Sequence, residues 1–180
     1  IVDGCSGRQK TINIPSEINH EGVIYRVTSI GSRAFESCKS FTSIVISDGV
    51  TSIGEKAFSC CQSLTSIVIG NGVTSIGEKA FEDCSSLTSV VVAEGNTVYD
   101  SREQCNAIIH TATNTLIRGC QSTIIPDSVT SIEWGAFRDC SSLTSIVIPE
   151  SVTGIGTWGF SCCRSLTSIV IWIGVASIAE

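Results

Sequence analysis

The sequence predicts a solenoid, a fold in which short repeated units stack and share one elongated hydrophobic core. Phenylalanines recur every 23 residues, at Phe35, Phe58 and Phe81 and again at Phe137 and Phe160. Each phenylalanine follows an alanine or glycine and precedes a cysteine by three positions. A unit this short cannot bury its apolar face alone, so the repeat predicts units that stack on their neighbours.

The repeat divides the chain into units when each unit starts at its first apolar residue. We expect one solenoid domain over residues 1–180, with an irregular first unit and an incomplete last unit. The unit 87–119 has 33 residues, ten more than its neighbours. The expected units span 9–40, 41–63, 64–86, 87–119, 120–142, 143–165 and 166–180.

Within one unit the residue pattern predicts two strands and a turn. The segment 64–69, LTSIVI, is short, apolar and β-branched, which predicts a strand. A glycine-rich turn follows, and VTSIG then predicts a second, shorter strand. The segment EKAFEDC predicts a helical or 3₁₀ turn that inserts Ala80, Phe81 and Cys84 into the core. Units stacked about 4.8 Å apart would join their first strands into a parallel sheet.

Composition and charge exclude several classes of protein. The hydrophobic fraction is 42% and the charged fraction 16%, the opposite of a disordered chain. A net charge of −6 argues against nucleic acid, which binds mainly through Lys and Arg. No apolar run approaches the roughly 18–20 residues of a membrane span. The sequence lacks methionine, so we expect a processed product or an excerpt of a longer protein.

No catalytic, cofactor or metal site is expected. His20 and His110 lie in unlike units, and His110 falls near a predicted turn. The sequence contains no phosphate-binding glycine loop, no HExxH and no G-x-S-x-G motif. The paired C-x-x-C spacing of zinc sites is also absent. The chain is therefore expected not to be an enzyme.

The cysteines that follow the phenylalanines are expected to be free, buried thiols. Parallel side chains in neighbouring units have poor geometry for a disulfide, although the units are close enough. Replacing Cys84 by alanine should cost about 1–2 kcal/mol. Serine should cost more, because its hydroxyl would lack a partner there. These positions are Cys38, Cys61, Cys84, Cys140 and Cys163.

The long unit predicts a hairpin, with strands at 106–111 and 115–119. Pairing Ile108 with Ile117 places Ile109 opposite Leu116 and also aligns two cysteines. Those two cysteines, Cys105 and Cys120, could form a disulfide or remain two buried thiols.

The pattern L-x-x-I-x-I, V-x-x-I-G-x-x-A-F-x-x-C at 23 residues resembles the BspA-like leucine-rich repeats over about residues 9–180. In the long unit, Val98 to Arg102 followed by Cys105 to Ile109 looks like a recurrent insertion of that family. The resemblance implies a right-handed, β-rich superhelix. It also implies an extracellular or cell-surface location and adhesion to host or other extracellular proteins, of the matrix or plasma type.

Two surfaces are candidates for binding. Solenoids bind mostly through the concave face of their main parallel sheet, where one serine column and one Val/Ile column should point outward without any charge. The candidate residues there are Ser66, Val68, Ser89, Val91, Ile124 and Val147. Alternatively, these aliphatic residues are simply good strand formers.

The second candidate surface is the start of the 93–120 insertion, a rare stretch of varied polar and aromatic residues in a monotonous chain. Loops on a rigid scaffold often carry binding specificity, and Tyr and Arg are frequent hot-spot residues. The candidates are Tyr99, Asp100, Arg102 and Glu103. The alternative is that the insertion only bends the solenoid.

These observations favour a monomeric, non-enzymatic protein-binding module that makes broad contacts with extended protein chains. The alternatives are a structural spacer or scaffold, or a regular lattice that binds glycans or ordered water. We expect both ends to be weak, because solenoids need capping units. Residues 1–8 have no repeat partner, and the last unit leaves Leu166, Ile169 and Ile171 open unless Trp172 covers them.

Overall fold

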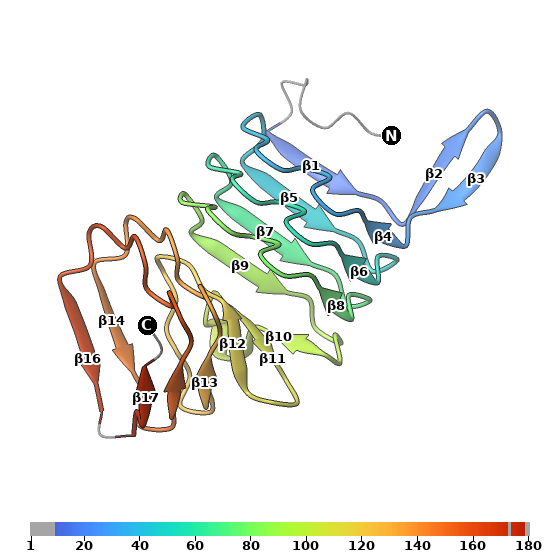
Figure 1. The fold of residues 1–180 in the computed structure, drawn as a ribbon. Helices are drawn as coiled ribbons and strands as arrows, with labels where there is room; N and C mark the ends of the chain where they lie inside the picture. Colours follow the sequence, from blue (N-terminus) through green and yellow to red (C-terminus); the bar gives the residue numbers. More distant parts are fainter. Residues whose placement is uncertain (1–9, 173, 179–180) are drawn as a thin grey trace.

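The computed structural model describes residues 10–172 and 174–178 (Figure 1). The expectation for residues 1–8 therefore lies outside the described residues. The chain forms a stack of coils, as the repeat predicts. Four first strands make one parallel sheet in the order β1 (Thr11–Ile14), β5 (Ser43–Ile46), β7 (Ser66–Ile69) and β9 (Ser89–Val92).

Two later first strands form a separate parallel pair, β14 (Ser145–Ile148) and β16 (Ser168–Ile171). Their register follows the repeat, since Ser145 lies beside Ser168 and Val147 beside Val170. The two sheets do not join, and Figure 1 shows them apart.

The second strands form two further groups. One is the parallel sheet β4 (Ser29–Ile30), β6 (Ser52–Ile53) and β8 (Ser75–Ile76). The other contains β13 (Ser131–Ile132), β15 (Gly154–Ile155) and β17 (Ser177–Ile178), which continue a sheet that begins in the insertion. Through its second strands, the stack of units 120–178 therefore continues the sheet of the insertion by strand pairing.

The segments with the Ala-Phe sequence are successive turns and not helices, in contrast to the expected helical turn. Lys56 and Cys60 have φ values of 53° and 59°, in the left-handed region that interrupts a helix. The amides of Phe58 and Cys60 instead donate to carbonyl groups of the next coil, at Ala80 and Glu82, both at 2.8 Å. Bonds between coils thus replace bonds within a helix.

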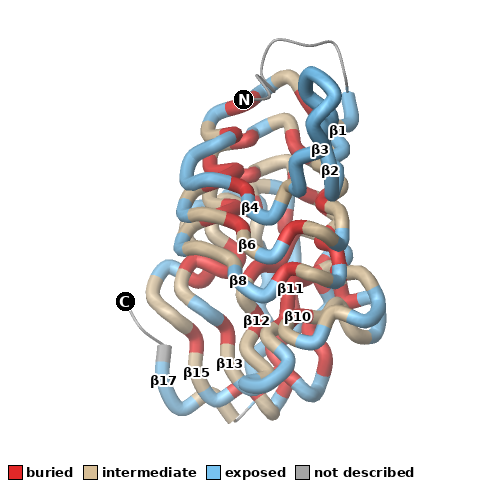
Figure 2. Tube along the Cα trace, turned by 90° about the vertical axis from the view of Figure 1, so that its right-hand side faces the viewer, coloured by how far each residue is buried: buried red, intermediate tan, exposed pale blue. Residues whose placement is uncertain are grey.

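The core is a set of stacked columns. The ring of Phe58 stacks on Phe35 at 5.2 Å and on Phe81 at 5.5 Å, while Phe137 stacks on Phe160 at 5.0 Å. These rings belong to two separate clusters of buried residues, one on each side of the insertion. Figure 2 shows the buried positions lining the inside of the coils.

The cysteine column confirms the expectation of free thiols at four positions: Cys61, Cys84, Cys140 and Cys163. The expectation is wrong for Cys38, which is disulfide-bonded. The free thiols also have acceptors. The Cys84 Sγ donates to the Phe58 carbonyl oxygen at 3.2 Å, and Cys61 Sγ donates to that of Phe35 at 3.0 Å.

Threonines link the coils in two ladders. The Thr65 hydroxyl donates to the Thr42 carbonyl oxygen at 2.9 Å, and the Thr88 hydroxyl donates to that of Thr65 at 3.1 Å. In the second ladder Thr74 donates to Thr51 in the same way at 3.2 Å. Each threonine is thus a donor to the preceding unit and, through its carbonyl, an acceptor for the next.

A hairpin that the sequence analysis missed projects from the first unit. It consists of β2 (Glu17–His20) and β3 (Val23–Arg26), paired antiparallel. Gly22 turns the chain with a φ of 83°, and its amide donates to the Asn19 side chain at 3.0 Å. All eight strand residues are exposed, and Figure 2 shows the hairpin outside the stack.

The insertion contains three strands and one turn of 3₁₀ helix: β10 (Tyr99–Asp100), η1 (Arg102–Gln104), β11 (Ile108–His110) and β12 (Thr115–Arg118). The predicted hairpin is confirmed, and Ile109 lies opposite Leu116. The pairing of Ile108 with Ile117 is wrong, because a bulge places Ile108 opposite Arg118.

The bulge also removes the alignment on which the predicted Cys105–Cys120 disulfide depended. Both cysteines are buried and free. The Cys120 Sγ donates to the carbonyl oxygen of Asn106 at 3.4 Å. The alternative of two buried thiols is therefore the correct one.

Candidate functional site

The insertion interrupts the first-strand sheet. The Ser101 hydroxyl accepts from the Val92 amide at 3.0 Å and donates to the Ala107 carbonyl at 2.7 Å. On the far side, the Ile124 amide donates to the Cys105 carbonyl at 3.1 Å. Backbone of the insertion thus lies between β9 and residues 123–125, whereas the Ser122 hydroxyl still donates directly to the Thr88 carbonyl at 2.6 Å. That segment forms no strand, so the expected six-rung sheet is wrong at this rung.

The outward columns are present on both sides of this interruption. Ser66 and Val68 in β7 are half-buried and lie beside Ser89 and Val91 of β9 in the expected register. Exposure of the Val/Ile column is highest just after the interruption, at two of the candidate side chains, and is lower again at Val170. The exposed fractions of these two candidates are 77% for Ile124 and 53% for Val147.

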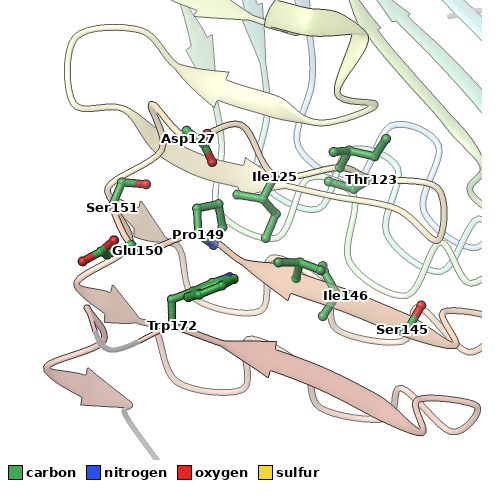
Figure 3. Close-up of a pocket in the computed structure, with 11 residues that line it drawn as sticks. Thr123, Ile125, Asp127, Ser145, Ile146, Pro149, Glu150, Ser151 and Trp172 are labelled. Atoms are coloured by element: carbon green, nitrogen blue, oxygen red, sulfur yellow. The ribbon is translucent and has the colours of Figure 1, made fainter.

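A groove of about 780 Å³ lies where the pairing of first strands is interrupted, between residues 123–127 and β14 (Figure 3). Strand β14 pairs with β16 alone, and in the described part of the chain no backbone hydrogen bond joins it to 122–125. One long edge of β14 therefore borders the groove. The lining includes Ile124, Ile125, Val147, Pro149 and Trp172, with Asp127 and Glu150 near one end.

Trp172 closes the lower end of the groove, where its ring lies toward Pro149 (Figure 3). The sequence analysis expected this tryptophan at the open edge of the stack and did not anticipate the groove. Ile169 and Ile171 in β16 are both exposed, which confirms that the last coil is open. The signal that could have located the groove is the length of the preceding unit, since extra backbone there displaces the next rung.

The candidate binding residues of the insertion differ in how far their side chains are exposed. Tyr99 is 7% exposed, and its ring packs edge-on against His110 at 5.7 Å, so this side chain is not available to a partner. Asp100 and Arg102 form an ion pair at 2.6 Å. Glu103 is exposed, with a φ of 59°.

The Asp100–Arg102 pair joins the first part of the insertion to the hairpin of the same insertion and to the following unit. The Arg102 guanidinium also donates to the side chains of Asn114 at 2.9 Å and Ser128 at 3.2 Å. Burial raises the pKa of Asp100, but hydrogen bonds and charge from Arg102 outweigh it and leave the pKa below its ordinary value. The pair is thus charged at neutral pH and stabilises the insertion.

The buried cysteine thiols are poorly suited to act as catalytic nucleophiles. Burial raises the pKa of the Cys61, Cys84 and Cys140 thiols to about 12, so they are protonated and poor nucleophiles at neutral pH. Across residues 10–172 and 174–178, no three His, Cys, Asp or Glu side chains are grouped so as to hold a metal ion. No helix within those ranges has the length and apolarity to cross a membrane.

Comparison with known proteins gives the family. The model of the BspA type leucine-rich repeat region matches residues 9–117 and 116–180, in six copies. No curated protein matches the chain. Among solved structures, a T. pallidum leucine-rich repeat protein has 25% identity and a TM-score of 0.55, over 97% of this chain and 80% of that one.

Two further structures have the same fold. A leucine-rich repeat protein from Bacteroides ovatus ATCC 8483 has 26% identity and a TM-score of 0.56, over 92% of this chain and 46% of that one. A leucine rich cell surface protein from Faecalibacterium prausnitzii A2-165 has 23% identity and a TM-score of 0.51, over 91% and 70%. With the family model spanning nearly the whole described stack, the chain belongs to the BspA-type leucine-rich repeat family.

Proposed function

We propose that this chain is a non-enzymatic protein-binding module that holds an extended segment of its partner in the groove beside β14. The observation that carries this proposal is the edge of β14, which has no strand beside it although the groove runs along it. An extended peptide placed there would add a strand to the sheet and bond to the free backbone groups.

Side chains around the groove suit such a partner. Ile124 and Val147 supply exposed aliphatic surface on its two sides, and Trp172 supplies a large ring that is 57% exposed. Tryptophan is among the residues that contribute most to protein interfaces. Backbone bonds would then provide affinity for any extended chain, and the apolar groups would select partner side chains.

The family supports a location on the cell surface or outside the cell, because BspA-type members are mostly surface or secreted proteins implicated in adhesion. Matrix or plasma proteins of a host are therefore the partners we propose. A glycan or ordered-water lattice would need a regular, uninterrupted array of small polar groups. The first-strand sheet ends at β9, after the Ser43–Ser66–Ser89 column, which favours protein over lattice binding.

The test is capture of matrix and plasma proteins by the purified chain, followed by affinity measurement for each protein captured. Val147→Lys places a charge in the groove, whereas Val170→Lys places it in the same column one rung away and outside the groove lining. We expect Val147→Lys to weaken binding at least about tenfold, a loss of 1.4 kcal/mol, and Val170→Lys to have little effect. Equal affinities for the two variants would contradict the groove as the site.

A further inference from the structure

A second cleft, of about 660 Å³, lies where the long unit lacks the Ala-Phe turn that other units have. Without that turn, units 64–86 and 120–142 meet directly, and the Arg138 guanidinium donates to the Glu82 carboxylate at 2.7 Å. The hairpin fills only part of the remaining space. The cleft is lined by aromatic side chains, including Phe81, Trp134 and Trp158, and by Arg118.

Arg118 occupies an inward position of β12 and is 5% exposed. Its Nη1 donates to the carbonyl oxygens of Gly135 at 3.2 Å and Arg138 at 3.1 Å. Its Nε and Nη2 are buried and have no hydrogen-bond partner among the described residues. Burying unpaired donors of a charged group is costly, so their retention calls for a ligand or for water.

The charge of Arg118 also lacks an internal counter-charge. Burial raises the pKa of the neighbouring Cys84 and Cys140 thiols to about 12, and the Arg118 charge only partly opposes that rise, so both thiols are neutral. Two carboxylates of the cleft have other partners, since Glu82 pairs with Arg138 and Glu78 pairs with Lys79 at 3.3 Å. Over the described ranges, no ion pair includes Arg118.

The two unpaired nitrogens share one edge of the planar guanidinium. Nε–H and Nη2–H point in parallel from that edge and match the two oxygens of a carboxylate. The opposite side of the group is already held by the two carbonyl oxygens that Nη1 contacts. The fork is therefore fixed in orientation before any ligand arrives, which lowers the entropy cost of binding.

We propose that this cleft binds a carboxylic acid with an aromatic or apolar body, whose carboxylate pairs with Nε and Nη2 of Arg118. The body would lie against Trp134 and Trp158, whose ring centroids are 5.6 Å apart. Glu78, Glu82 and Glu133 also line the cleft, which disfavours a doubly charged phosphate over a singly charged carboxylate. Because both nitrogens are buried, we expect the side chains that cover them to move aside on binding.

The test is calorimetric titration of the full chain with 3-phenylpropionate, with 3-phenylpropanamide as the uncharged control and inorganic phosphate as the anion control. Arg118→Met replaces the charge and the two unpaired buried donors with an apolar side chain, at the cost of the bonds to the Gly135 and Arg138 carbonyls. Arg118→Lys retains the charge without the fork. We expect saturable binding of the acid alone, at least about tenfold weaker in Arg118→Lys and absent in Arg118→Met.

Thermal melts establish that each variant is folded before it is titrated. Val147→Lys, in the groove, should bind the acid like the parent chain, so this result is independent of the proposed function. Peptides ending in Phe, with free or amidated C-termini, distinguish a protein terminus from a small free acid as the source of the carboxylate. Equal binding of acid and amide, equal binding of phosphate, unchanged binding in Arg118→Met, or only ordered water at the two nitrogens would overturn the proposal.

Discussion

Units 41–86 and units 120–165 carry nearly the same repeat, yet they build different surfaces. In the first region β5 and β7 pair in register with each other and with the flanking strands β1 and β9, the phenylalanine rings form a continuous stack and the Thr65 hydroxyl links one coil to the other. In the second region residues 122–125 form no strand, and the first strands form a separate sheet that begins at β14. The sequences differ at this rung, where 120–125 reads CQSTII and 64–69 reads LTSIVI. The buried Thr123 stands at the position of an inward isoleucine, and its hydroxyl donates to the Asn106 carbonyl of the insertion at 2.7 Å, so both the local sequence and the neighbouring backbone contribute to the difference.

The insertion supplies the neighbouring backbone. Its residues 101–107 hydrogen-bond to β9 on one side and to Ile124 on the other, so they occupy the space in which 123–125 would have paired. On the opposite side of the coil, β12 pairs with β13 and keeps the stack continuous. The insertion thus interrupts the sheet of first strands, while its own strands continue into the second strands of the following units. Both candidate binding cavities lie next to the insertion.

The largest expected difference between the regions concerns their aromatic columns. Phe58 is fully buried between two rings, whereas Phe160 is partly exposed and stacks on one. Phe58→Ala should lower the free energy of unfolding by about 3–5 kcal/mol. Phe160→Ala should cost roughly half as much, because less apolar surface loses its burial. Urea unfolding measures both, and equal costs would show that the two columns are equivalent in spite of the open end.

The second prediction concerns the fastening of the insertion. Asp100→Asn should lower the free energy of unfolding at pH 7 by about 1–3 kcal/mol, the range for hydrogen bonds to charged groups. Because the folded pKa of Asp100 is lowered, its contribution is complete above the unfolded pKa of about 3.9 and is lost as pH falls through the folded value. Parent and variant should therefore converge below about pH 4.

The exposed Glu103 provides the matched control for that pH series. Glu103→Gln changes a carboxylate three residues away and should alter stability by no more than about 0.5 kcal/mol. A constant difference between Asp100→Asn and the parent chain at all pH values would mean that the ion pair is not the source of the effect.

A smaller effect is expected in the cysteine column, where the sequence analysis predicted serine to be worse than alanine. The thiol of Cys84 donates to the Phe58 carbonyl, so a serine hydroxyl there has an acceptor. We now expect Cys84→Ser and Cys84→Ala to cost about the same, near 1–2 kcal/mol. Cys163→Ser, at a half-buried position, should cost less than either. A serine penalty far above that of alanine would restore the original expectation.

The smallest effect is local opening at the end of the stack. Strand β16 is exposed along its length, whereas β7 alternates between buried and half-buried positions. Amide hydrogen exchange should therefore be faster in β16 than in β7, at a temperature where the chain remains folded. Slower exchange in β16 than in β7 would indicate that this coil is protected in some other way.

Much of the fold could be predicted because the same apolar positions recur in every unit. The inward positions, the two strands of the regular units and the hairpin at 106–119 all follow from local patterns. The projecting hairpin of β2 and β3 was missed, although the turn at Gly22 is a recognisable signal. Its strands are exposed on both faces, so they lack the alternation that identifies a half-buried strand.

The sites were harder to predict, because they depend on contacts between units. The segment 122–125, STII, is β-branched and suits a strand, yet the hydroxyl of the buried Thr123 bonds to the Asn106 carbonyl of the insertion, and no strand forms. Tyrosine is a residue type that is frequent in binding hot spots, yet Tyr99 is buried inside the insertion. Arg118 ends an apolar strand and carries no motif. Its burial follows from the missing turn of its unit, which no local window of sequence reveals.

The threonine ladders have a consequence for how such a chain can change in length. In the regular units the threonine that precedes the first strand has a carbonyl oxygen placed to accept the hydroxyl of the next unit, as Thr42 does for Thr65 and Thr65 for Thr88. A duplicated copy of 64–86 would therefore meet an interface identical to the one it left. Whole units can be gained or lost by recombination without redesigning a contact, whereas a gain of ten residues, as in unit 87–119, obliges the next rung to find a different neighbour.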